Sequence, residues 1–202
     1  MIENLLKQYL SSKRINHSYL VAETAKSLAL HWQYNKKLSY EAGLLHDITK
    51  ELTPTDLESL QINLTPNLKK IHSEFPQIFH AFSAPYFLPK VYQCNAKILN
   101  AIKWHTTGKA ALTKLEKIIF IADYIEPDRK FLTKDYITDL AYNNLNEAIL
   151  AINIASLIYL INRGIKIYPK LIECHNYYLA QLPSEKIKII TKNVLEISKN
   201  EH

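Results

Sequence analysis

Hydrophobic side chains recur at helical spacing along nearly the whole chain, and no segment reads convincingly as a strand. Ser39 is a plausible N-cap for a third helix, and Thr53-Pro54 marks the start of another. Residues 63–67 are expected to form a loop, and Pro85 should kink or end the helix that contains it. Helices are expected at about residues 2–10, 16–32, 39–47, 54 onward, 76–88, 95–104, 113–124 and 138–162, and two final helices at Pro169 and Pro183.

No linker, repeat or low-complexity segment divides this pattern. The interpretation is therefore one all-α domain over residues 1–202, a helical bundle. The C-terminal helices, from about residue 138 to 202, are expected to pack on the core formed by the N-terminal two thirds.

Composition supports a folded helical protein. Hydrophobic residues make up 48% of the 202 residues and charged residues 22%, which is enough for a real core. Only three glycines occur, which favours helices over turn-rich sheets. No glycine-rich phosphate loop is present, so phosphate binding would have to rely on metals and cations.

Charge and cysteine usage narrow the partners and the compartment. The formal net charge of +6 suits a polyanionic partner such as a nucleotide, or simply a solvated lysine-rich surface. Lysines are scattered, so nucleic acid is not expected. Two distant cysteines argue against zinc ribbons and disulfide scaffolds. Without a signal-peptide pattern or an uncharged stretch of about 18–20 apolar residues, the chain is expected to be cytoplasmic, away from membranes.

A series of histidines and aspartates carries the candidate chemistry. Imidazole and carboxylate groups together bind transition metals, and a carboxylate can bridge two ions. A dinuclear centre makes a water molecule nucleophilic and neutralises phosphoryl oxygens. A single histidine or an isolated His-Asp pair is weak evidence, because most histidines on apolar faces are structural; the ordered combination is more specific. The candidate ligands are His17, His46, Asp47, His80, His105 and Asp123.

Three segments carry a resemblance: GLLHDITK at 43–50, HTTG at 105–108 and LEKIIFIADYIEPDR at 115–129. With the order of the ligands, they resemble the HD-domain phosphohydrolases, and more narrowly the YqeK-type symmetrical diadenosine tetraphosphatases. The resemblance covers most of the chain. It implies an all-helical HD-domain bundle and hydrolysis of diadenosine tetraphosphate to two ADP.

The resemblance also implies a dinuclear centre of iron, with manganese or cobalt as alternatives. One metal would be held by His17, His46, Asp47 and Asp123. Asp47 would bridge, and His80 with His105 would complete the second position. One departure is visible, since Ala81 follows His80 where the family commonly has glycine. An added methyl group there could shift His80.

Several neighbouring side chains are candidates for catalysis or substrate binding. Asp47 and Lys50 are expected to act in catalysis, with Lys50 as a phosphate-binding cation or else a solvated lysine at a helix end. Arg129 could grip phosphate oxygens, and Glu126 could orient Arg129 or a ligand histidine; both could instead form a surface salt bridge. Thr106 could bond the substrate or cap its loop.

Alternatives remain open at this point. His72 competes with His80 as a ligand, although its setting resembles a helix end. The enzyme could be an HD-type nucleotidase or dNTP phosphohydrolase acting on another nucleotide. It could also be a non-catalytic HD protein that senses nucleotides, or a helical interaction protein whose histidines are coincidental. The sequence leaves open whether the chain forms a homodimer.

Overall fold

The protein, described here by a computed structural model over residues 1–199, is all helical. No strand occurs among these residues, so the prediction of an all-α fold is confirmed. His202 lies outside the described range. The helices are α1 (Ile2–Tyr9), α2 (Ser12–His31), α3 (Lys36–Leu45), α4 (Pro54–Ser59), α5 (Pro66–Glu74), the 3-10 helix η1 (Pro76–Ile78), α6 (Phe79–Val91), α7 (Ala96–Trp104), α8 (Lys114–Ile125), α9 (Lys134–Asn143), α10 (Leu145–Asn162), α11 (Pro169–Ala180) and α12 (Ser184–Ser198).

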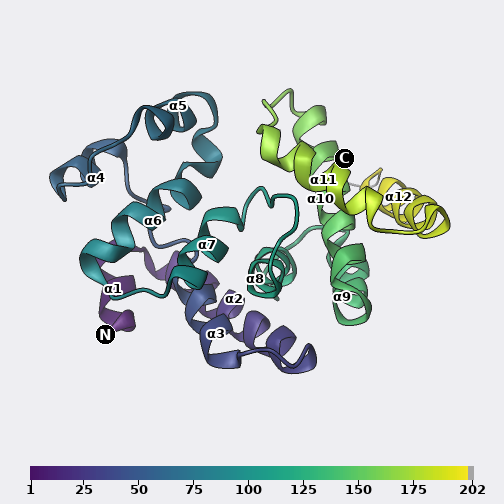
Figure 1. Ribbon diagram of the computed structural model, residues 1–202, viewed down its shortest axis with the longest axis horizontal. Coiled ribbons are helices and arrows are strands. Elements are labelled where there is room, and N and C mark those ends of the chain that lie inside the picture. Colours follow the sequence, from purple (N-terminus) through teal and green to yellow (C-terminus); the bar gives the residue numbers. More distant parts are fainter. Residues whose placement is uncertain (200–202) are drawn as a thin grey trace.

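Helix α8 occupies the middle of the molecule (Figure 1). Helices α1–α7 lie on one side of it and α9–α12 on the other. Helix α8 packs against α2, α3 and α7 on the first side and against α9 and α10 on the second. Its sequence suits this position, because nearly every apolar residue from Leu115 to Ile125 is buried. The core therefore runs through α8 from one group of helices to the other.

Helices α2 and α3 approach each other closely at Gly43. A Cβ atom at Gly43 would lie 2.6 Å from the Cα atom of Ala22, a separation that real side chains do not tolerate. Ala22 and Ala42 are both fully buried nearby. Small residues thus let the backbones of these two helices come together.

Capping residues define several helix starts. Thr53 and Asp56 form a capping box that begins α4 at Pro54, as the sequence predicts. The predicted N-cap of α3 is wrong: Asn35 caps this helix, and its side chain accepts a hydrogen bond from the backbone N–H of Leu38. Ser39 lies one turn inside, and its hydroxyl donates to the carbonyl of Asn35. The pattern missed this start because the helix begins with two lysines, Lys36 and Lys37.

The predicted long helix over 138–162 is two helices. Asn144 has an extended backbone, with φ −158° and ψ 111°, and its side chain caps α10 by accepting from the N–H groups of Asn146 and Glu147. Apolar periodicity continues through this break, so it does not reveal the break. In contrast, α6 continues past Pro85 to Val91, so Pro85 does not end it. The predicted loop at 63–67 is shorter, because α5 begins at Pro66.

Helix α10 is apolar on all sides. Its 18 residues meet the length and composition of a membrane-spanning helix, contrary to the expectation from the sequence. However, 56% of that stretch is buried inside the protein, and α10 packs against α8, α9, α11 and α12. Burial within the helical bundle accounts for its hydrophobicity.

Candidate metal centre

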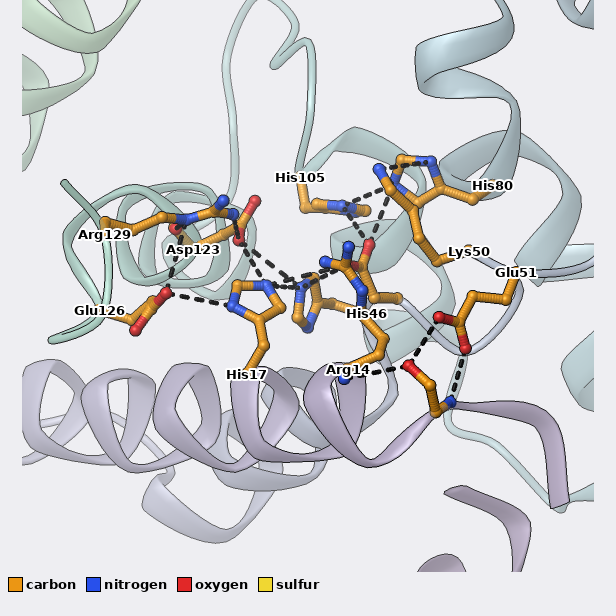
Figure 2. A network of polar contacts seen from close by, with 12 residues as sticks. Arg14, His17, His46, Lys50, Glu51, His80, His105, Asp123, Glu126 and Arg129 are labelled. Atoms are coloured by element: carbon orange, nitrogen blue, oxygen red, sulfur yellow. Dashed lines mark hydrogen bonds and ion pairs between the residues drawn. The ribbon is translucent and has the colours of Figure 1, made fainter. Parts of the chain in front are cut away.

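The six candidate ligands converge from five parts of the chain (Figure 2). His17 lies on α2, His80 on α6 and Asp123 on α8. His46 and Asp47 follow the last residue of α3, and His105 follows the last residue of α7. Within this cluster, three groups of three side chains have potential ligand atoms within 4.8 Å of one another: His17, His46 and Asp47; His46, His105 and Asp123; and Asp47, His80 and His105.

Asp47 lies between two pairs of histidines. Its Oδ1 atom is 3.0 Å from Nε2 of His80 and 3.5 Å from Nε2 of His105. Its Oδ2 atom is 3.6 Å from Nε2 of His46 and 3.8 Å from Nε2 of His17. Because α3 ends just before it, the carboxylate turns inward, and each oxygen faces a different pair. This is the arrangement that a bridging carboxylate requires.

Asp123 adds a second carboxylate on the Oδ2 side of Asp47. Its Oδ1 atom lies 3.1 Å from Nε2 of His17 and 3.6 Å from Nε2 of His46. Three donor residues therefore surround the space next to Oδ2 of Asp47. We call this group, with Oδ2 itself, the Oδ2 side, and the group of His80 and His105 with Oδ1 the Oδ1 side.

Two of the histidines are held by the carbonyls of their own helices. Nδ1 of His46 lies 2.7 Å from the carbonyl oxygen of Gly43, and Nδ1 of His105 lies 2.7 Å from that of Ile102. A carbonyl oxygen only accepts hydrogen bonds, so each Nδ1 carries a hydrogen, and in the neutral ring Nε2 presents a lone pair. Both rings are thus oriented for metal binding through Nε2.

His17 is oriented in the same way by a carboxylate. Its Nδ1 lies 3.2 Å from Oε1 of Glu126, a buried residue that ends α8. The other oxygen of Glu126 accepts a hydrogen bond of 2.7 Å from the backbone N–H of Asp128. Of the two roles considered for Glu126, orienting a ligand histidine has direct geometric support, and Arg129 Nε also lies 3.6 Å from Oε1.

The donor set fits a divalent metal ion. Nε2 of His17 and Nε2 of His46 are only 3.2 Å apart, although both atoms present lone pairs. Facing lone pairs repel unless a cation lies between or beside them. Nitrogen and carboxylate oxygen donors of this kind suit first-row transition metals.

Electrostatics keep both carboxylates ionised. Burial alone would raise the pKa of Asp47, but the surrounding imidazoles of His46, His105 and His80 outweigh it and hold that pKa well below its usual range. Burial likewise opposes ionisation of Asp123, yet the facing imidazoles of His17 and His46 and the guanidinium of Arg129 keep its pKa well below the usual value. Both side chains are therefore anionic at neutral pH.

Lys50 lies over the ring of His80. Its Nζ atom is 3.2 Å from Nδ1 and 3.3 Å from Nε2 of that ring. Burial lowers the pKa of Lys50 and lowers the pKa of His80 to about 3, so the imidazole is neutral. Lys50 thus reaches the cluster, as its spacing from His46 suggests, although it lies in the turns after α3.

Arg129 is fixed beside Asp123. Its Nε donates to the backbone carbonyl of Asp123 at 2.8 Å, and its Nη2 donates to Oδ1 of the same residue. These contacts place the guanidinium at the cluster, on the side away from Lys50 (Figure 2).

A cavity of about 390 Å³ opens beside the cluster. Lys50, His105, Asp123 and Arg129 line its polar end. Thr106 also lines it, and its buried hydroxyl has no hydrogen-bond partner among residues 1–199. The apolar remainder includes Phe131, Ile152, Tyr159, Leu160, Tyr168 and Leu171. Volume and lining are those of a small-molecule pocket, which typically spans about 300–1,000 Å³.

Arg14 is a site residue that the sequence reasoning missed. Its Nη1 donates to Oδ2 of Asp47 at 2.8 Å. The signal was its position three residues before His17 on the same helix, which places both side chains on one face.

Two further histidines lie away from the cluster. His72 is exposed and packs edge-on against Phe79, so it does not compete with His80. His31 packs against Trp32 and Tyr142. The methyl group of Ala81 is fully buried and does not hold His80 away from Asp47.

The chain matches the family described as HD domain over residues 14–128, a stretch that contains all six candidate ligands and more than half of the 202 residues. The chain therefore belongs to the HD-domain family, as its resemblance implied.

Similar proteins include two named "Bis(5'-nucleosyl)-tetraphosphatase, symmetrical". The one from Staphylococcus aureus is 39% identical over 194 residues, covering 92% of this chain and 96% of that protein. The one from Halalkalibacterium halodurans is 30% identical over 178 residues, covering 88% of this chain and 95% of that protein. A solved structure from Clostridium acetobutylicum, titled a "predicted HD superfamily hydrolase involved in NAD metabolism", superimposes with a TM-score of 0.81 at 30% identity, over 90% of this chain and 96% of that one.

Proposed function

We propose that this chain is a metal-dependent hydrolase that cleaves diadenosine tetraphosphate, and related dinucleoside polyphosphates, symmetrically to two ADP. The observation that carries the proposal is the carboxylate of Asp47, whose two oxygens each face a separate pair of histidines. The names of the Staphylococcus aureus and Halalkalibacterium halodurans relatives support the reaction and its regiochemistry.

The proposed ligand set follows the two sides of Asp47. His17, His46 and Asp123 would hold one ion with Oδ2, and His80 and His105 would hold the other with Oδ1. Iron is the proposed metal, with manganese or cobalt as alternatives, because mixed imidazole and carboxylate donors suit all three. When bound, such ions lower the pKa of water and neutralise phosphoryl oxygens.

The cavity is the proposed site for one nucleotide half of the substrate. Its volume of about 390 Å³ lies near the lower end for ligand pockets, which suits one half better than a whole dinucleotide. Lys50 and Arg129 line the end next to the cluster, where they would bind phosphate oxygens. Thr106 would donate its free hydroxyl to the same phosphates, and Glu126 would act through His17 and Arg129.

The domain organisation and the setting are also proposals. Residues 1–202 would form one HD domain, with the helices from about 138 onward closing the cavity over the metal-binding core. The enzyme would act in the cytoplasm on a nucleotide, without a membrane or nucleic acid.

The test is the product set. Purified without a His tag and supplied with iron(II) or manganese(II), the protein should convert diadenosine tetraphosphate to ADP alone. Formation of AMP and ATP would contradict symmetrical cleavage. A substrate panel distinguishes the alternatives: preference for mononucleotides or dNTPs would identify another HD-type nucleotidase. Tight nucleotide binding without turnover, at full metal content, would identify a nucleotide sensor.

A further inference from the structure

Three cationic side chains surround the candidate metal cluster. Lys50 and Arg129 line the cavity, whereas Arg14 is not among its lining residues. In Figure 2, Arg129 and Lys50 lie on opposite sides of His17 and His46, and Arg14 rises between them from α2. The cluster is therefore approached by cations both inside and outside the cavity.

Most hydrogen-bond donors of the Arg14 guanidinium have no partner within residues 1–199. Within residues 1–199, its guanidinium makes one contact, the 2.8 Å hydrogen bond from Nη1 to Oδ2 of Asp47. A guanidinium carries five N–H donors in a planar fork, and 28% of the Arg14 side chain is exposed. Arg129 differs, because the backbone and carboxylate of Asp123 already occupy its Nε and Nη2.

The backbone of Arg14 is tied to the segment that carries Asp47. Ser11 caps α2, and its hydroxyl accepts from the N–H of Arg14. The carboxylate of Glu51 in turn accepts from the N–H and hydroxyl of Ser11, at 2.6 and 2.7 Å. Glu51 follows Lys50 directly in the sequence. The start of α2 and the His46–Glu51 turn are thus clamped together, which fixes Arg14 beside the cluster before any ligand binds.

We propose that Arg14 binds the phosphates of the substrate half that lies outside the cavity, and so sets the preference for dinucleoside polyphosphates over mononucleotides. This inference rests on the proposed function. Symmetrical cleavage requires the centre of the tetraphosphate to lie at Asp47. One half of the substrate lies in the cavity beside Lys50 and Arg129. The two phosphates of the other half must then lie on the side of Asp47 where the guanidinium of Arg14 donates its hydrogen bond.

A simpler role makes different predictions. If Arg14 only orients Asp47, its loss should weaken metal binding and should affect every ligand of the site alike. If it binds the outer phosphates, its loss should spare the metals and spare a ligand that fills only the cavity. Comparison of a whole dinucleotide with ADP separates the two roles.

The experiment uses the metal-loaded protein and two ligands that are not turned over: ADP, and diadenosine tetraphosphate with a methylene group replacing the central bridging oxygen. Arg14→Gln should weaken binding of the dinucleotide analogue about 10- to 100-fold, the loss typical of one hydrogen bond to a charged group. ADP affinity and metal content should stay unchanged. Arg14→Lys should recover only part of the loss, because an ammonium cannot form two parallel bonds to a phosphate.

Lys13→Gln is the matched control, because Lys13 is an exposed neighbour on the same helix and its removal costs the same charge. It should leave both affinities unchanged. Equal weakening of both ligands by Arg14→Gln, or loss of metal, would overturn the proposal in favour of a purely orienting role. Unchanged affinity for the analogue would also overturn it. Failure of the wild-type protein to release ADP alone would instead contradict the proposed function.

Discussion

The two sides of Asp47 differ in how their histidines are held. On the Oδ2 side, Nδ1 of His17 faces a carboxylate and Nδ1 of His46 faces a carbonyl. On the Oδ1 side, His105 is held by a carbonyl in the same way. The Nδ1 atom of His80 faces Nζ of Lys50, which can donate but cannot accept while it is protonated.

This difference indicates unequal metal positions. A histidine that binds metal through Nε2 normally donates its Nδ1 hydrogen to an oxygen, and that partner fixes the ring. The Oδ2 side meets this requirement before metal binds. On the Oδ1 side, the Nδ1 atom of His80 has no such oxygen partner among residues 1–199, and Nζ of Lys50 lies nearly as close to Nε2 as to Nδ1. We therefore expect the Oδ2 side to bind its ion more tightly and the Oδ1 side to lose its ion first.

Replacement of Asp47 should have the largest effect, because this residue belongs to both sides. Asp47→Ala should remove both ions and reduce ADP release to background. Metal analysis of untagged protein, together with a turnover assay, measures both quantities. Glu58→Ala, which removes an exposed carboxylate on α4, serves as the control. Retention of turnover by Asp47→Ala would refute the proposed centre.

Replacement of His80 should separate the two sides. His80→Ala removes a donor from the Oδ1 side only, so the protein should retain about one ion per chain. Turnover should fall roughly 10²- to 10³-fold, as is typical when one stabilising contact to developing charge is lost. Loss of both ions in equal measure would show that the two sides do not bind independently.

Replacement of Glu126 should weaken the better-oriented side. Glu126→Gln changes the group that accepts from Nδ1 of His17, and loss of such a partner typically costs about 10- to 100-fold in metal affinity. Competition with a chelator measures the effect, and the exposed Glu173 provides the control variant Glu173→Gln. A loss confined to the Oδ1 side would reverse the comparison drawn above.

Replacement of Lys50 should have the smallest effect on metal content. Lys50→Met keeps the buried aliphatic stem and removes the ammonium that faces His80. The ion on the Oδ1 side should bind at least as tightly as before, whereas ADP release should fall because the cavity loses a phosphate-binding cation. Titration with manganese(II) and initial rates provide the two measurements. Weaker binding on the Oδ1 side would mean that Lys50 supports the ring of His80.

Much of the fold and the identity of the six clustered side chains could be predicted from the sequence. Helical periodicity locates the apolar helices. In motifs such as GLLHDITK, the polar candidate ligands directly follow the apolar end of such a helix. Residues 17 and 123 come together only through packing of α2 on α8, so their contact follows from the family resemblance rather than from local pattern.

Other features leave little trace in a single sequence. In the sequence, Arg14 cannot be distinguished from a surface cation, because only the fold brings it to Asp47. The helix break at Asn144 interrupts no apolar repeat. The interaction of Lys50 with His80 depends on how two turns and α6 meet. Such tertiary contacts involve residues far apart in the chain, and local propensity carries no information about them.

Gly43 links the packing of α2 and α3 to the geometry of the metal-binding histidines. It allows α2 and α3 to touch, and its carbonyl orients His46. The distance between these helices therefore also sets the distance between His17 and His46, two donors from different helices. Substitutions in the α2–α3 interface would then change which ionic radius the site accommodates. Variants of this interface could be selected for growth with different metals supplied. Helix packing would then provide a way to engineer metal preference.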